Sequence, residues 1–164
     1  MLLPFKKILY PTDFSDPSCH GLRSAAELAE HFGAELIVMH VVSPVPIAQP
    51  PFPGVPGGNI TFDVPLYQNE LTESSRKRLD EIVSREVPER VSVRKEVTIG
   101  DHAFEILRMA EEEKVDLIVI PTRGRSGWRK FMFGSVAEKV IKHATRSVLT
   151  IHCPLEIPPR KERK

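Results

Sequence analysis

The sequence is poor in cysteine and in net charge. Among its 164 residues the two cysteines, Cys19 and Cys153, lie far apart and form neither a CxxC pair nor a metal-ligand spacing. Two isolated thiols favour a reducing compartment over a disulfide-stapled secreted fold. The formal net charge is only +1. Because nucleic-acid binding usually requires a strongly basic face, we expect no nucleic-acid partner.

Long apolar segments are missing as well. No stretch approaches the ~18 consecutive apolar residues of a membrane helix. The N-terminal run MLLPFKKILYP is interrupted by Pro4 and by the pair Lys6 and Lys7, which leaves it too short for a signal peptide. We therefore expect a cytoplasmic protein without a membrane partner.

Familiar catalytic motifs are also missing. The chain contains no GxxxxGK[ST] phosphate loop, no GxGxxG after its first apolar run and no GxSxG nucleophile elbow. Its six histidines show no HExxH or comparable ligand spacing. We therefore predict no catalytic residues and no metal ligands. His40, inside an apolar run, is expected to be a hydrogen-bonded core residue, whereas His102 is expected near the cleft without an evident partner.

What the sequence does contain is an alternation of two periodicities. Runs of branched apolar residues such as ELIVMHVV (35–42) and DLIVI (116–120) lack in/out alternation, which is typical of strands covered on both faces. Between the runs, apolar residues recur at helical spacing, as at Leu22, Ala25 and Ala29. The pattern predicts strands at 7–10, 35–42, 91–97, 116–120 and 147–152, and helices at 17–32, 66–87, 103–110 and 135–144.

This order predicts an α/β fold with a mainly parallel sheet and helices on both of its faces, a three-layer α/β/α arrangement. The length suits one domain, which we assign to residues 1–153. Within this domain, 43–65 is a proline-rich loop. Residues 154–164 follow the domain as a charged tail that we expect to be disordered. In such sheets ligands bind beyond the carboxyl ends of the strands, where the strand order reverses.

The segment from Pro121 to Ser135, PTRGRSGWRKFMFGS, is the richest candidate for a binding loop. It follows a buried strand and opens a helix. Gly124 and Gly134 permit close approach of a ligand to the backbone. Ser135 and Glu138 have the spacing of a capping box. Unpaired amides at the start of the helix, together with its dipole, predict an anion site whose natural occupant is phosphate.

Basic side chains in the same segment are suited to neutralising phosphate. They are Arg123, Arg125, Arg129 and Lys130. The same residues also fit a solvated surface, and the glycines also fit a turn before a capped helix that binds nothing. Both interpretations of the segment remain open from the local pattern.

A second candidate is Pro11-Thr12-Asp13, directly after the first predicted strand. A carboxylate at this place can hydrogen-bond a ribose hydroxyl or a base edge, as in dinucleotide-binding folds. Aspartate is also among the commonest turn residues. By itself the signal does not separate the two roles.

These segments together resemble the universal stress protein family over about residues 5–152. The matching stretches are KKILYPTDFS, ELIVMHVV, GDHAFEILRMAEEEKVDLIVI and the final VAEKVIKHATRSVLTI. Nucleotide-binding members of the family carry G-x-x-G-x9-G-[S/T]. Gly124, nine further residues, Gly134 and Ser135 match this motif, whereas Pro121 stands where the family has its first glycine. Proline has no amide hydrogen to donate and restricts φ.

The resemblance implies a five-stranded parallel sheet of order 3-2-1-4-5 and ATP, with or without Mg²⁺, as the ligand. It implies a homodimer joined through the last strand, 147–152, whose apolar edge invites pairing with a second copy. Asp13 and Val41 are implied to border the adenosine. The expected nucleotide-binding residues are Pro11, Thr12, Asp13, Val41, Ile120, Pro121, Arg123, Gly124, Gly134, Ser135 and Val136.

The residues and the resemblance leave three candidate functions for this protein. The first is an ATP-binding stress-response or regulatory dimer with at most slow hydrolysis. The second is a dimeric interaction module of the same family that does not bind nucleotide, favoured by Pro121 in place of glycine. The third is a nucleotidyl transferase of the related ATP-pyrophosphatase type. The third is disfavoured because PTDFS stands where those enzymes have SGGxDS.

Overall fold

The computed structural model describes residues 4–46, 63–124 and 134–154. Its five strands form one parallel sheet of order β3-β2-β1-β4-β5. The predicted fold class and strand order are therefore confirmed. The elements are β1 (Lys7–Pro11), α1 (Asp16–Phe32), β2 (Glu35–Val42), α2 (Val64–Glu86), β3 (Val93–Ile99), α3 (His102–Glu112), β4 (Leu117–Gly124), α4 (Ser135–His143) and β5 (Ser147–Pro154).

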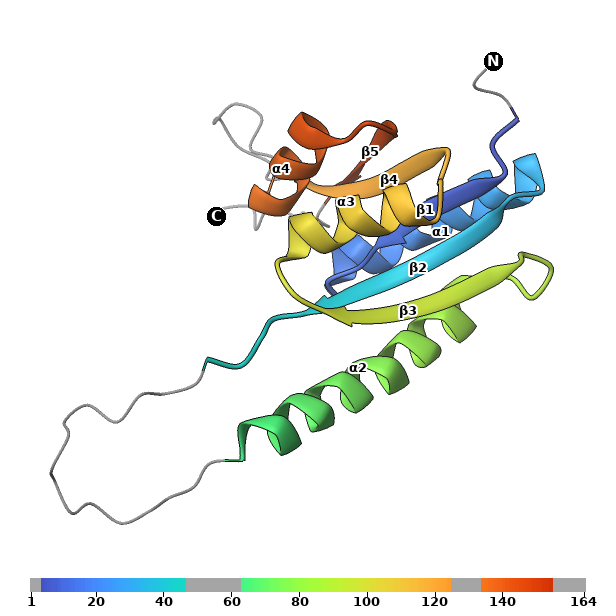
Figure 1. Ribbon diagram of the computed structural model, residues 1–164. Coiled ribbons are helices and arrows are strands. Elements are labelled where there is room, and N and C mark those ends of the chain that lie inside the picture. The colour runs from blue at the N-terminus through green and yellow to red at the C-terminus, as the bar shows by residue number, and fades with distance from the viewer. Residues whose placement is uncertain (1–3, 47–62, 125–133, 155–164) are drawn as a thin grey trace, which may run out of the picture.

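Helices cover both faces of the sheet, as Figure 1 shows. Successive side chains of a strand point to opposite faces. In β1, Ile8 and Tyr10 accordingly pack with the core residues of α1 and α2, while Leu9 packs with those of α3 and α4. This double burial explains why the central strands are continuously apolar rather than alternating.

Several element boundaries differ from the sequence prediction, three of them for a visible reason. Helix α1 begins at Asp16, one residue before the predicted start at residue 17, and Ser15 is its N-cap. Helix α2 begins at Val64, because the Asp63 side chain accepts a hydrogen bond from the Leu66 amide and caps it. Strand β3 covers Val93–Ile99 rather than 91–97, since its register is set by pairing along β2 and not by its own alternation.

Parts of two predicted segments lie outside the described residues. These parts are 47–62 of the proline-rich loop and 155–164 of the tail. The assignment of 1–153 to a single domain stays a prediction. Among the described helices, none combines the length and apolar character that crossing a bilayer requires.

A glycine in α1 allows the helix to approach β1 and β4 closely. A Cβ placed on Gly21 would lie 2.5 Å from the Tyr10 hydroxyl oxygen and 3.2 Å from Pro121 Cβ. Tyr10 cannot easily retreat, because its side chain is fully buried and its hydroxyl donates a 2.5 Å hydrogen bond to the Ser18 carbonyl. The contact links the start of α1 to the carboxyl ends of both strands.

We expect Gly21→Ala to lower the free energy of unfolding by roughly 1–3 kcal/mol, the usual cost of overpacking. This cost exceeds the gain of about 1 kcal/mol that alanine brings in helix propensity. Urea unfolding measures the change. In a Tyr10→Phe background the closest atom is gone, so the same substitution should cost less. An equal cost in both backgrounds would show that the hydroxyl is not the obstacle.

Candidate functional site

The sheet opens at the carboxyl end of its central strand. Strand β1 pairs with β4 at Ile8–Leu117 and Leu9–Ile118, whereas β4 continues beside β5 as far as Gly124. On its other side β1 stays paired with β2 up to Pro11. The chain leaves β1 toward β2 and later returns on the far side of β1 as β4, so this is the point where the strand order reverses.

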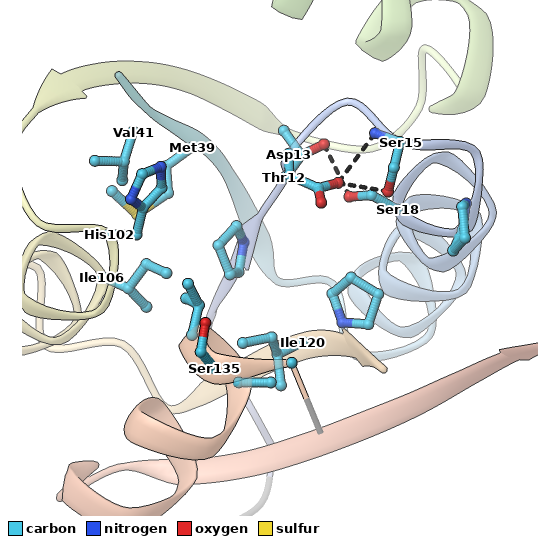
Figure 2. A pocket seen from close by; sticks show the side chains of 16 residues that line it. Thr12, Asp13, Ser15, Ser18, Met39, Val41, His102, Ile106, Ile120 and Ser135 are labelled. Atoms are coloured by element: carbon cyan, nitrogen blue, oxygen red, sulfur yellow. Dashed lines mark hydrogen bonds between the residues drawn. The ribbon is translucent and has the colours of Figure 1, made fainter. Parts of the chain in front are cut away.

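A pocket of about 320 Å³ lies at this opening (Figure 2). It is lined by the ends of β1, β2 and β4 and by the first turns of α1, α3 and α4. The lining residues are Pro11, Thr12, Asp13, Ser15, Pro17, Ser18, Met39, Val41, His102, Ile106, Ile120, Pro121, Gly134, Ser135, Val136 and Ala137. Nine of the eleven residues predicted to bind nucleotide are among them, whereas Arg123 and Gly124 are described only as backbone of β4 and are not tested by the lining. What these residues bind stays a prediction at this point.

The turn after β1 is held by its own side chains. Thr12 Oγ1 accepts hydrogen bonds from the Phe14 amide at 3.1 Å and from the Ser18 hydroxyl at 2.9 Å. Asp13 Oδ1 accepts two from Ser15, from the amide at 3.0 Å and from the hydroxyl at 2.5 Å. These bonds, drawn in Figure 2 where they join pocket residues, fix an exposed carboxylate at the rim.

Behind this turn a stack of rings fixes its position. Phe14 has a φ of +62°, a left-handed conformation that is uncommon for a bulky residue. Its ring stacks on His40 with centroids 4.0 Å apart, and the Arg78 guanidinium carbon lies 5.0 Å from the ring centroid. Arg78 also donates a hydrogen bond to the Phe14 carbonyl at 3.3 Å. The stack therefore connects the turn to β2 and α2.

His40 matches the prediction of a hydrogen-bonded core histidine. Its Nδ1 lies 2.8 Å from the Thr12 carbonyl oxygen. Since a carbonyl only accepts, Nδ1 carries the proton. Burial lowers the pKa of His40 and outweighs the hydrogen bond to Thr12, which raises it. Nearby charges act in both directions, with His102 and Arg78 lowering the pKa and Asp13 raising it.

The start of α4 faces the pocket without a side-chain cap. Its N-cap is Gly134, and no described side chain accepts a hydrogen bond from its first turn. The predicted capping box of Ser135 and Glu138 is wrong, because the helix begins at Ser135 and places that residue inside the first turn. The Glu138 amide bonds the Gly134 carbonyl at 2.9 Å. The three preceding amides come before the first intrahelical bond, so they have no partner within the helix.

Strand β4 carries the remaining predicted residues. Pro121 lines the pocket and pairs in register with Ile151. Arg123 and Gly124 continue the strand beside Cys153 and Pro154, and only their backbone is described. Of the loop between β4 and α4, residues 125–133 lie outside the described part, so the predicted roles of Arg125, Arg129 and Lys130 are not tested.

The family model that describes the universal stress proteins matches residues 4–152. The chain belongs to the universal stress protein family. Universal stress protein MJ0531 of Methanocaldococcus jannaschii is 34% identical over 160 residues, covering 96% of this chain and 85% of that relative. The family assignment made from the sequence is therefore confirmed.

Solved structures of universal stress proteins have the same fold as this chain. That of MJ0577, a universal stress protein of the same organism, has a TM-score of 0.66 at 28% identity and covers 90% of this chain and 95% of its own. A universal stress protein from Archaeoglobus fulgidus, solved in complex with dAMP, has a TM-score of 0.54 at 23% identity and covers 90% and 98%. At that identity the likeness shows the fold alone.

Several pocket residues of this universal stress protein were not predicted from the sequence. They are Ser15, Pro17, Ser18, Met39, Ile106 and Ala137. Met39 precedes Val41 by two positions in β2, so strand periodicity alone places both on one face. The serines carry no such signal, because a serine near a helix start usually indicates a cap.

We expect stability to depend on the protonation of His40. Because the folded pKa is lowered, the unfolded chain binds the proton more readily, and the free energy of unfolding decreases as the pH falls below about 6.5. The decrease is modest, since water screens the partly exposed ring. Denaturant unfolding from pH 7.5 to 5 measures it.

His40→Asn keeps an N–H donor near Nδ1 and should flatten this pH dependence. His20→Asn, at an exposed position on α1, is the matched control and should leave it unchanged. An equal pH slope in the wild type and in His40→Asn would contradict the assignment.

Proposed function

We propose that this universal stress protein binds ATP in the pocket between β1 and β4. The observation that carries the proposal is the geometry of the pocket. It places the Pro11–Asp13 turn, with its hydrogen-bonded carboxylate, opposite a helix N-terminus that no described side chain caps, at the carboxyl edge of a parallel sheet. Sugar hydroxyls suit the first group and phosphate suits the second.

The phosphates are proposed to lie at Gly134, Ser135 and Val136, where the amides of the first turn of α4 donate to anionic oxygens. Arg123 and Gly124 are proposed to meet the outer phosphates, and bound Mg²⁺ to accompany them. The universal stress protein of the same fold that was solved with dAMP supports an adenine nucleotide as the ligand class.

A regulatory role with at most slow hydrolysis fits this pocket best. Asp13 and His102 are its ionisable lining residues in the described part of the chain. Figure 2 shows them on different sides of the pocket, and Asp13 Oδ1 already accepts two hydrogen bonds from Ser15. We further propose a cytoplasmic location and no nucleic-acid partner, on the basis of the near-neutral charge.

Pro121 favours one competing function, a dimeric module that does not bind nucleotide. It lines the pocket where the family motif has glycine, and it offers no amide hydrogen. Its ring also packs toward Gly21 of α1, which leaves little room for the strand to shift. Loss of one amide donor weakens a phosphate site but leaves the α4 terminus intact, so ATP binding remains the proposal.

Thermal unfolding with and without ATP and Mg²⁺ tests the two functions. At a hundredfold excess over Kd, a ligand specific to the native state adds about 2.7 kcal/mol. Each kcal/mol raises Tm by roughly 2–4 °C for a domain of this size. We expect a shift of several degrees with ATP and a smaller one with AMP. No shift at millimolar ATP would favour the nucleotide-free module.

Gly134→Val should abolish the ATP shift, because a branched side chain blocks phosphate from the α4 amides. The substitution suits the fold, since a Cβ on Gly134 meets no described atom within 4 Å and its φ is −59°. Lys142→Val adds the same side chain at the far end of α4 and should keep the shift. An unchanged ATP affinity in Gly134→Val would show that the phosphates bind elsewhere.

We also propose that the protein forms a homodimer through β5, residues 147–152. This strand lies at the edge of the sheet, and Leu149 on it is 38% exposed. An apolar edge strand can pair with its own copy about a twofold axis. Neither Leu149 nor its strand neighbours line the pocket, so dimer formation and nucleotide binding are separable.

Leu149→Lys should convert the dimer to a monomer, because it brings two charges together at the paired edges. Sedimentation velocity measures the change. Ile141→Lys is the matched control, since Ile141 is 39% exposed but lies on α4, and it should remain dimeric. A dimer that persists in Leu149→Lys would place the interface on another surface.

A further inference from the structure

The pocket has three chemically distinct parts. One wall is polar and carries the side-chain oxygens of Thr12, Asp13, Ser15 and Ser18. In it, Ser15 donates hydrogen bonds to Asp13, and the Ser18 hydroxyl donates one to Thr12. The opposite wall consists of the apolar side chains Met39, Val41 and Ile106 from β2 and α3. The third part is the first turn of α4, which no described side chain caps.

His102 stands on the apolar wall and is the only aromatic side chain among the described lining residues. Figure 2 shows its ring beside Met39, Val41 and Ile106, across the pocket from Asp13 and Ser15. As the first residue of α3 it is held in place by the cap, because Asp101 accepts a 3.0 Å hydrogen bond from the Phe104 amide. The His102 side chain is half-buried and lines the pocket.

The parts of a nucleotide match these surfaces in only one way. Phosphates require the amides and dipole of α4, and ribose hydroxyls require the oxygens of the polar wall. The flat, apolar base is left with Met39, Val41, Ile106 and the His102 ring. Aromatic side chains gain favourable energy by stacking on nucleobases, and the gain tolerates any base because every base has a π-face.

We infer that His102 is the base-stacking residue of the site, and that its imidazole makes the pocket prefer nucleotides over sugar phosphates without a base. The inference rests on the proposed function, because it assumes that a nucleotide occupies the pocket. It adds a ligand contact outside the glycine motif, on a helix that the motif does not reach.

Isothermal titration of ATP with Mg²⁺ into the wild type, His102→Ala and His102→Phe tests the inference. Removing a stacking partner weakens binding by roughly five- to a hundredfold, so we expect a loss of that order in His102→Ala. His102→Phe preserves a ring face and should retain most of the affinity. Phe104→Ala is the matched control, since Phe104 lies on the same helical turn, is 62% exposed and does not line the pocket.

A triphosphate carrying 2-aminopurine supplies a spectroscopic readout that a structural role would not change. Its fluorescence is quenched when the base stacks, so quenching on binding should be strong in the wild type and in His102→Phe and weak in His102→Ala. Unfolding without ligand should give the same Tm for the three proteins.

The outcomes separate the inference from the proposed function. ATP binding that is unchanged in His102→Ala, or lost equally in the alanine and phenylalanine variants, would overturn the stacking role and leave the nucleotide site standing. No binding of ATP by the wild type would remove the proposed function and the stacking role with it.

Discussion

The rest of the structure depends on the position of β1 between β2 and β4. A strand in the middle of a parallel sheet is covered on both faces, so Ile8 and Tyr10 enter one core and Leu9 the other. Because the chain continues from β1 to β2 and reaches β4 only later, the strands separate beyond the Leu9–Ile118 pair. The pocket is a geometric consequence of this topology.

The two sides of the pocket differ in how they are held. The turn after β1 is fixed by hydrogen bonds, whereas the start of α4 has no described side-chain cap. Thr12 and Asp13 are held by hydrogen bonds, and the ring stack of Phe14, His40 and Arg78 supports them from behind. By contrast, α4 begins at a glycine N-cap without a described side-chain partner. A preorganised polar turn facing a helix N-terminus suits an anionic ligand that carries hydroxyl groups.

Sequence reasoning succeeded where one local pattern corresponds to one structural cause. Continuous branched runs identified the buried strands, and the glycine motif located the start of α4. It failed where the cause lies in another part of the chain. The start of β3 is set by pairing of Leu36 with Val93. The roles of Ser18 and Met39 depend on neighbours that are distant in sequence.

By itself, the sequence determined the order of the elements, the parallel sheet, the family and most of the predicted residues that line the pocket, because these follow from periodicity and from a motif of fixed spacing. Only the tertiary structure decided that His102 joins Met39 and Val41 in one wall, that Gly21 lies against Tyr10 and Pro121, and that Ser135 does not cap its helix. Such contacts bring together residues from different elements, and a linear pattern contains no information on the distance between them.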